Sequence, residues 1–226
     1  DHLGRCILSR LIYGAQTTLL NSLVVLAGIL LIGIPLGLIS GFCGGWIDNL
    51  IMRFADIVST FPSSLLALAV VSVFGAGLQN VMIVLVALWW APFARILRSQ
   101  VLKIKEKDFV MAAKASGTSK FKIVINHVLL NSISPIIVYS TLRVAAVIMH
   151  IASFSFIGLG TQPPAADWGV MLSDSKQFIS TAPLMMIWPG LSIMLVVFSL
   201  NMFGEGLNEA LMPGGNKKAK QLGDGE

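Results

Sequence analysis

Charged side chains are scarce in this 226-residue chain, since Asp, Glu, Lys and Arg together make up only 12% of it. A soluble globular domain carries about 25%. Hydrophobic residues make up 55%, and the mean hydropathy is +0.82. So few charges cannot cover a water-exposed surface, although they suffice where lipid covers the protein. The composition therefore predicts an all-α bundle of transmembrane helices, which its glycines and prolines do not oppose, because both are frequent in membrane helices.

Signs of catalytic, redox or nucleotide chemistry are also missing. The two cysteines, Cys6 and Cys43, have no metal-ligand spacing. The three histidines, His2, His127 and His150, fall outside, inside and within the predicted membrane, and no H-E-x-x-H occurs. A membrane enzyme therefore lacks a catalytic constellation. Without a G-x-x-x-x-G-K-[ST] phosphate cradle, we expect no ATP or other cofactor in this chain.

Five apolar stretches are long enough to cross a bilayer, which needs roughly 20 residues per helix. They cover residues 17–40, 57–74, 81–97, 129–156 and 184–203, and Pro62 interrupts the second. The chain starts with Asp1 and shows no signal-peptide pattern, so we expect an upstream segment, and one further helix in it would make the number of spans even. The domain organisation that follows is one helical membrane domain, residues 1–213, and a flexible cytoplasmic tail, residues 214–226.

Lysine and arginine placement predicts the orientation. If residues 95–122 and the C-terminal tail are cytoplasmic, then twelve of the sixteen Lys and Arg residues lie inside, and only Arg5, Arg10 and Lys176 lie outside. The positive-inside rule then places the N-terminus outside and the C-terminus in the cytoplasm. The net charge of +5 flanks apolar segments in this way, so it predicts membrane topology and lipid contact rather than nucleic-acid binding.

The cytoplasmic loop, about residues 104–128, reads as two short helices joined by a tight turn. Residues 108–115 are rich in small side chains, Gly117 suits a helix C-terminus, and Ser119 suits the N-cap of a helix that runs on into the fourth span. Such a knob lets a partner approach closely. The alternative is a solvated basic linker.

This stretch resembles the coupling loop of ATP-binding cassette importer permeases, in which Glu-Ala-Ala is followed at fixed spacing by Gly and by Ile-x-Leu-Pro. Ala112, Ala113, Gly117 and Leu129 match the pattern. The chain departs from it because Met111 replaces Glu, and the residues at 127 and 130 are His and Leu rather than Ile and Pro.

The resemblance to the dipeptide/oligopeptide/nickel branch of this family extends along the chain. It includes DHLGRC at residues 1–6, FSFIGLGTQPP at 154–164, DWGVML at 167–172, and the last span with its exit at 201–213. It implies a type I importer transmembrane domain in a bacterial cytoplasmic membrane. The implied partners are a second permease subunit, two ATPases that bind ATP and Mg²⁺, and an extracytoplasmic solute-binding protein.

On this resemblance, the ATPase-coupling residues are those at the knob, namely Met111, Ala112, Ala113, Ala115, Ser116, Gly117, Thr118 and Ser119. ATP hydrolysis by the partners would move the knob, and the chain itself would be a non-catalytic transport subunit. A channel or passive scaffold, the other rival, would need no such dock.

The fourth span carries two ionisable residues, Arg143 and His150, seven apart and therefore on one helix face. Ser140 and Ser153 extend this polar stripe. Ionisable groups inside a membrane usually face a cavity or a partner. The stripe is thus either part of a translocation pathway or a polar seam against the second permease.

His150 also bears on the substrate, because imidazole is a good nickel ligand and the nickel permeases resemble this chain at that position. One histidine is not a metal site, and a hydrogen-bonded structural role is the alternative. We therefore expect nickel or a metal chelate as the substrate, with dipeptides or oligopeptides as the alternative.

The predicted external loop contains Pro163, Pro164, Asp167 and Trp168, and we expect it to dock the binding protein. Alternatively, Trp168 anchors at the bilayer interface. At the start of the second span, Asp56 lies either at the cytoplasmic mouth of a pathway or on a solvated helix start.

Overall fold

The computed structural model of the protein describes residues 1–211, which form α-helices and short helical turns without a strand. The predicted tail, residues 214–226, lies outside the described part. The longer helices are α1 (Ile7–Cys43), α2 (Gly45–Thr60), α3 (Ser63–Phe74), α4 (Leu78–Ile104), α8 (Ser134–Phe156) and α10 (Leu184–Leu211). The shorter elements are α5 (Asp108–Ala115), α6 (Lys120–Lys122), a π-helix (Ile123–Leu129), α7 (Leu130–Ser132), α9 (Trp168–Ser175) and a 3-10 turn (Lys176–Phe178).

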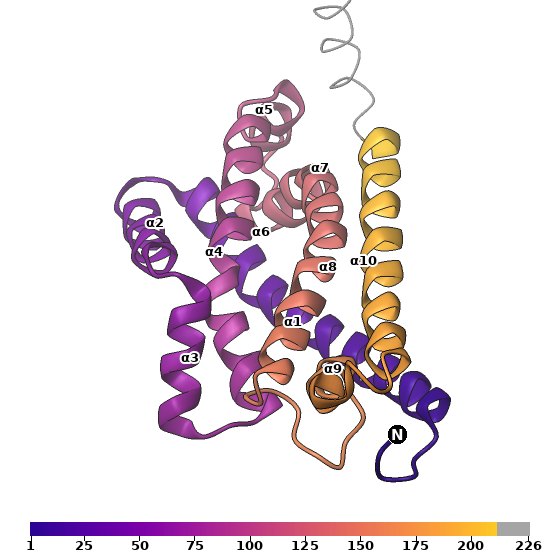
Figure 1. The fold of residues 1–226 in the computed structure, drawn as a ribbon. Coiled ribbons are helices and arrows are strands. Elements are labelled where there is room, and N and C mark those ends of the chain that lie inside the picture. The colour runs from indigo at the N-terminus through magenta and orange to yellow at the C-terminus, as the bar shows by residue number, and fades with distance from the viewer. Residues whose placement is uncertain (212–226) are drawn as a thin grey trace, which may run out of the picture.

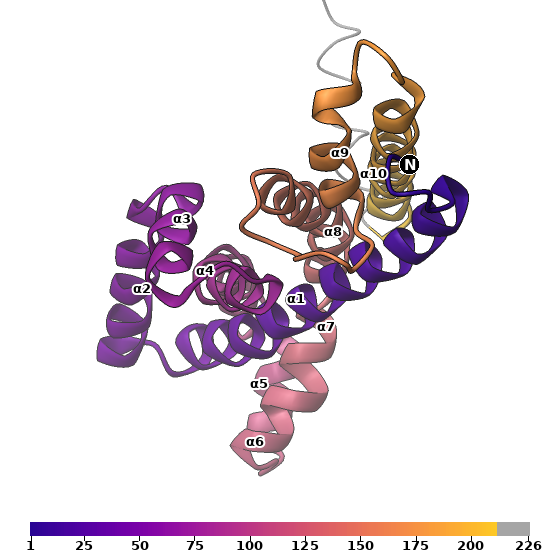
Figure 2. The same cartoon turned by 60° about the horizontal axis from the view of Figure 1, so that its bottom comes forward.

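Four helices are long and apolar enough to cross a membrane, namely α1, α4, α8 and α10. They correspond to the first, third, fourth and fifth predicted spans. α1 is considerably longer than predicted. Its 37 residues extend about 55 Å, well beyond a hydrocarbon core of about 30 Å. Figure 2 shows α1 running obliquely across the other helices.

The second predicted span, residues 57–74, is not one helix. α2 and α3 meet at a bend of 81°, because Pro62 has no N–H to donate and pushes the residue before it out of the helical region. Phe61 is accordingly extended, with φ −83° and ψ 133°. α3 has 12 residues and spans only about 18 Å, so it is too short to cross a bilayer by itself.

α2 is amphipathic. Asp48 and Ala55 are buried, whereas Trp46, Leu50 and Phe54 are exposed. Gly44 separates α1 from α2, and both Gly44 and Gly45, the first residue of α2, have positive φ values of +67° and +59°, which other residues rarely adopt.

α1 and α4 approach closely along a row of glycines. Gly33, Gly37 and Gly41 follow each other at four-residue intervals on α1 and face α4. A Cβ at Gly37 would lie 2.6 Å from the carbonyl oxygen of Ala94, and one at Gly41 would lie 2.7 Å from the Cβ of Val101. Small residues at this spacing let membrane helices pack backbone to backbone, so the two helices form the centre of the core.

The two ends of the bundle differ. α5 and α6 lie at one end together with the C-terminal end of α10, whereas the N-terminus and α9 lie at the opposite end (Figure 1). The start of α1 and the end of α10 thus lie at opposite ends of the bundle. The lysines of the 103–122 segment belong to the α5 end.

Candidate functional site

The loop that protrudes at the α5 end has the predicted helix–turn–helix form. α5 has the predicted bounds, and Gly117 follows it with φ +77°. Gly117 N–H donates to Lys114 O at 3.1 Å and Thr118 N–H donates to Ala113 O at 3.1 Å. These two bonds form a Schellman motif, which ends a helix and turns the chain sharply.

Most of the predicted coupling residues are accessible on this loop. Ala113 and Thr118 are half-buried, and the exposed ones are Met111, Ala112, Ala115, Ser116, Gly117 and Ser119. Ser119 holds the predicted N-cap position of α6, although its side chain makes no capping hydrogen bond. Buried Val110 and Ile123 fix the base of the loop to the core.

The helix after the turn does not run directly into the fourth span. α6 passes into a seven-residue π-helix, Ile123–Leu129, then into α7, and α8 begins only at Ser134. Pro135 stands at the start of α8, where its missing N–H is tolerated. The connection between the loop and α8 is therefore segmented, whereas α4 reaches the loop as one helix.

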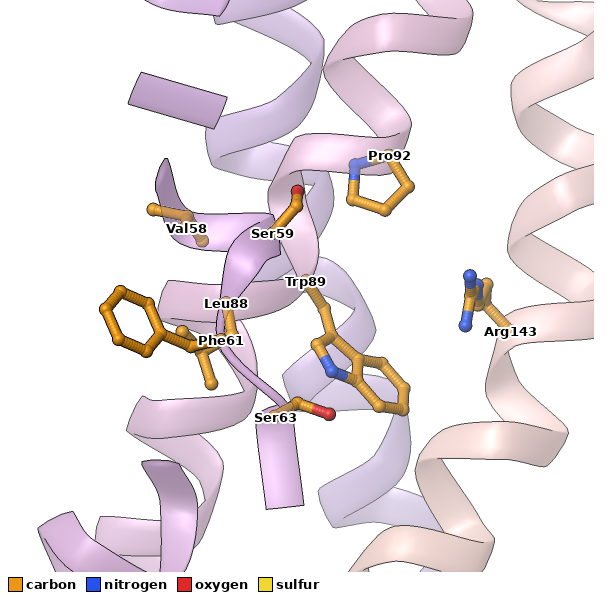
Figure 3. Close-up of a pocket in the computed structure, with 8 residues that line it drawn as sticks. All are labelled: Val58, Ser59, Phe61, Ser63, Leu88, Trp89, Pro92 and Arg143. Carbon is orange, nitrogen blue, oxygen red and sulfur yellow. The ribbon is translucent and has the colours of Figure 1, made fainter. Parts of the chain in front are cut away.

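A cavity of about 170 Å³ opens at the break between α2 and α3 (Figure 3). Its wall comes from the break, from α4 and from α8, and it consists of Val58, Ser59, Phe61, Ser63, Leu88, Trp89, Pro92 and Arg143. One predicted pathway residue, Arg143, thus faces a cavity. Trp89 lies between the break and Arg143.

Arg143 is held by aromatic side chains. Its Nε donates to the Tyr139 hydroxyl at 2.7 Å. Its guanidinium carbon lies 4.9 Å from the Tyr139 ring centroid and 5.4 Å from that of Trp89, within the range of cation–π attraction. Within residues 1–211, Arg143 forms no salt bridge.

His150 also contacts Trp89. The two ring centroids are 4.5 Å apart in an edge-on arrangement. Both Arg143 and His150 therefore touch one tryptophan, which confirms that they share a helix face. The hydroxyls of Ser140 and Ser153 instead donate to carbonyls of their own helix, those of Ile136 and Met149.

The hydrogen bond of His150 does not decide its predicted metal role, because a donating Nδ1 leaves Nε2 available as a ligand. Its Nδ1 lies 2.9 Å from Ala146 O, and since a carbonyl oxygen only accepts, Nδ1 carries the proton in this contact. The part of the chain that the structure describes has no group of three or more His, Cys, Asp or Glu side chains that could hold a metal ion. The structural alternative, a hydrogen-bonded histidine against Trp89, fits these contacts.

The predicted docking loop divides into exposed and buried residues. Pro163 and Pro164 are exposed, but Asp167 is 0% and Trp168 is 3% exposed. Asp167 caps α9 by accepting from Gly169 N–H at 2.9 Å, and it also accepts from the Thr18 hydroxyl at 3.0 Å.

Trp168 donates from Nε1 to Leu11 O at 3.1 Å. Both buried residues therefore join α9 to α1, and neither is available to a docking protein in this structure. Burial also excludes Trp168 as a lipid-facing interface anchor. The docking prediction now rests on Pro163 and Pro164.

Two ion pairs join α2 to α4. Asp56 pairs with Arg95 at 2.9 Å on the exposed side, so Asp56 is not a free acidic group at a pathway mouth. Asp48, which is buried, accepts from Arg98 Nε and Nη2 at 2.5 Å each and from the Ser40 hydroxyl of α1. The roles of Asp48, Arg98 and Trp89 in these contacts were not predicted from the sequence. The Trp89–Trp90 pair, which is unusual in an apolar span, was the one signal that pointed to Trp89.

A family model described as "Binding-protein-dependent transport system inner membrane component" matches residues 33–214. The chain is 46% identical to the dipeptide transport system permease protein DppC of Alkalihalophilus pseudofirmus, over 94% of this chain and 70% of that protein. It is 38% identical to the nickel transport system permease protein NikC of Escherichia coli, over 94% of this chain and 77% of that protein.

The chain is also 40% identical to the glutathione transport system permease protein GsiD of Pectobacterium atrosepticum, over 94% of this chain and 71% of that protein. Its fold matches a chain of the MetNI methionine ABC transporter in an inward-facing conformation, with a TM-score of 0.72 at 18% identity, over 91% of this chain and 97% of that chain.

Proposed function

Since the chain belongs to the family of binding-protein-dependent transport system inner membrane components and is a permease subunit of an ATP-binding cassette importer, we propose that it imports small peptides across a bacterial cytoplasmic membrane. The proposed complex contains a second permease subunit, two ATPases that bind ATP and Mg²⁺, and an extracytoplasmic binding protein. The α5 end would face the cytoplasm, and the loop with Pro163 and Pro164 at the opposite end would face the binding protein.

The knob at the α5 end is the observation that supports coupling of this chain to an ATPase. Its small exposed residues, Ala112 and Ala115, lie on a short helix that ends in a Schellman turn at Gly117. Buried Val110 and Ile123 tie the knob to the core. A surface that is small, exposed and rigidly based suits a groove in an ATPase. The proposed role of residues 111–119 is to transmit ATPase motion to the helices.

Two observations support a peptide rather than free nickel. The dipeptide permease is 46% identical to this chain and the nickel permease 38%. His150, which suggested a metal, has no cluster of further ligands among residues 1–211. A metal chelate remains the second candidate, because the nickel permease matches over 94% of the chain.

The test is uptake into proteoliposomes that contain this chain with its second permease, ATPases and binding protein. ATP-dependent uptake of alanyl-alanine would support the proposal. Uptake of Ni²⁺, free or chelated, without peptide uptake would replace peptides by metal as the substrate. If the chain failed to co-purify with an ATPase and neither solute entered, the proposed coupling would be wrong.

A further inference from the structure

Arg143 stands apart from the other arginines that line helix contacts in this protein. Arg95 and Arg98 pair with Asp56 and Asp48, and Arg5 and Arg10 contact Asp1 and Asp174. Arg143 lies near the middle of α8, a helix that crosses the membrane, and has no acidic partner within residues 1–211. A charge at that depth is costly unless it is paired or faces a polar cavity.

The contacts of Arg143 fix its position without neutralising its charge. The Tyr139 hydroxyl accepts from Nε and Nη2, while the rings of Tyr139 and Trp89 lie within cation–π distance. Arginine has five N–H donors, and Nη1 makes no hydrogen bond to any described residue. The guanidinium is thus oriented and still has donors for a ligand.

The cavity places these donors opposite polar groups from another element. Ser59 and Ser63 line it from the two sides of the α2–α3 break, and Arg143 lines it from α8 (Figure 3). The Ser59 hydroxyl already donates to Ala55 O at 2.7 Å, so it offers only lone pairs to a further partner. The wall can therefore accept an N–H on one side and donate to an anion on the other.

We propose that Arg143, backed by Trp89 and Tyr139, binds the carboxylate of the substrate as it crosses this cavity. The inference rests on the proposed function and specifies the substrate class as carboxylate-bearing. Arginine suits this role because its planar fork matches a carboxylate in a bidentate fashion. A fixed positive charge also disfavours passage of a free divalent cation, so a metal would pass only within an anionic chelate.

The experiment uses the assembled importer with its binding protein in proteoliposomes and compares Arg143→Gln and Arg143→Lys with the native chain. Uptake of radiolabelled alanyl-alanine is measured beside ATP hydrolysis stimulated by loaded binding protein. Arg53→Gln is the matched control, because Arg53 is exposed on α2 and forms no salt bridge with a described residue.

Arg143→Gln should lower uptake about tenfold or more, the loss expected for one charge-assisted hydrogen bond. Arg143→Lys keeps the charge but loses the bidentate fork, so its uptake should lie between that of Arg143→Gln and the native rate. Stimulated ATP hydrolysis and co-purification of the second permease should persist in both variants, and Arg53→Gln should behave as the native chain.

Native uptake by Arg143→Gln would overturn the inference. So would loss of the second permease or of stimulated ATP hydrolysis in that variant, since Arg143 would then serve assembly or coupling. Rapid uptake of free Ni²⁺ by the native complex would also overturn it. Absence of any peptide uptake by the native complex is a different result, because it refutes the proposed function itself.

Discussion

Gly117 has a left-handed backbone conformation, so it is the position of the knob that least tolerates another residue. A Cβ would meet no atom within 4 Å there, so the constraint is conformational rather than steric. Non-glycine residues pay about 1–2 kcal/mol to adopt such a φ. Proline cannot adopt it at all and would also remove the hydrogen bond from Gly117 N–H to Lys114 O.

We therefore expect Gly117→Pro to lower ATP-dependent uptake more than tenfold while the chain still inserts into the membrane. Gly117→Asn is the matched control, because asparagine tolerates this conformation, and it should retain most uptake. Uptake and membrane content of both variants in vesicles provide the measurement. Equal uptake by Gly117→Pro and the native chain would refute the coupling role.

Asp167 gives a second prediction at this scale. Burial raises its pKa above the ordinary value of 3.8, although hydrogen bonds from Thr18 and from the backbone of α9 oppose the shift. The folded state therefore holds the proton more tightly than the unfolded state does. Stability from this group is fully present below the ordinary pKa and declines as the pH rises through the raised one.

Asp167→Asn should flatten this decline, because asparagine still caps a helix but does not ionise. Asp167→Ala should lower the free energy of unfolding by about 1–2 kcal/mol, the usual cost of losing an N-cap. Thermal unfolding in detergent between pH 4 and pH 7 would measure both effects. An unchanged pH profile in Asp167→Asn would show that this carboxyl does not titrate in that range.

Local signals explain which residues could be predicted from the sequence. The helix at 108–115 and the turn at Gly117 follow from short-range preferences, and both are confirmed. The burial of Asp167 could not be predicted in the same way, because it depends on Thr18, which lies 149 residues away. The cluster of Trp89 with Arg143 and His150 likewise joins two helices that are distant in sequence.

Among the elements, the contact between α1 and α4 leads to the clearest prediction. A Cβ at Gly37 would lie 2.6 Å from the oxygen and 3.0 Å from the Cα of Ala94. Backbone atoms cannot move aside as a flexible side chain can. Gly37→Ala should therefore destabilise the protein by about 1–3 kcal/mol, the usual cost of overpacking.

Gly206→Ala is the control for Gly37→Ala, since Gly206 also lies within a long helix but a Cβ there would meet nothing within 4 Å. It should be neutral or stabilising by up to about 1 kcal/mol, because alanine favours helix more than glycine does. Thermal unfolding in detergent compares the two variants. Equal shifts in both would mean that the α1–α4 contact is looser than these distances imply.

The predicted spans show what hydropathy alone can and cannot give. It located α1, α4, α8 and α10, because each contains a long apolar run. It did not separate α2 from α3, since both sides of Pro62 are apolar enough to pass as one span. The bend of 81° follows from the missing N–H of proline and from the ion pairs that hold α2 against α4. A hydropathy profile does not register such ion pairs, so it could not predict the bend.

At the scale of the whole molecule, the two cysteines report on topology. Cys6 and Cys43 are free, exposed and located at opposite ends of α1. With the N-terminus outside, an impermeant maleimide should label Cys6 in right-side-out vesicles and Cys43 in inside-out vesicles. Hydrogen bonds from Ser9 and Leu8 lower the pKa of the Cys6 thiol, which should speed its labelling because the thiolate is the nucleophile.

Cys6→Ser and Cys43→Ser, each labelled separately, identify the signal from the other cysteine. Labelling of Cys43 in right-side-out vesicles would reverse the proposed orientation and place the knob outside the cell. The overall architecture was predictable to this level, since the apolar runs located the four long helices and Lys/Arg placement located the basic end.

α4 is one helix from Leu78 to Ile104 and can act as a lever, although Pro92 inside it removes one backbone hydrogen bond and gives it a place to bend. Its last residue, Ile104, leads into the knob, and Trp89 lies on the same rod about 22 Å away. Tilting the rod by about 10° would swing Trp89 by about 4 Å relative to the knob. Because the glycine row holds α4 against α1, the two helices would tilt together. The bundle can then bend at Gly44–Gly45 and at Phe61–Pro62, where the helices are interrupted. A displacement of the knob would then widen or narrow the space between Trp89 and the α2–α3 break. Trp89, which packs against Arg143, would be the part of the cavity wall that moves.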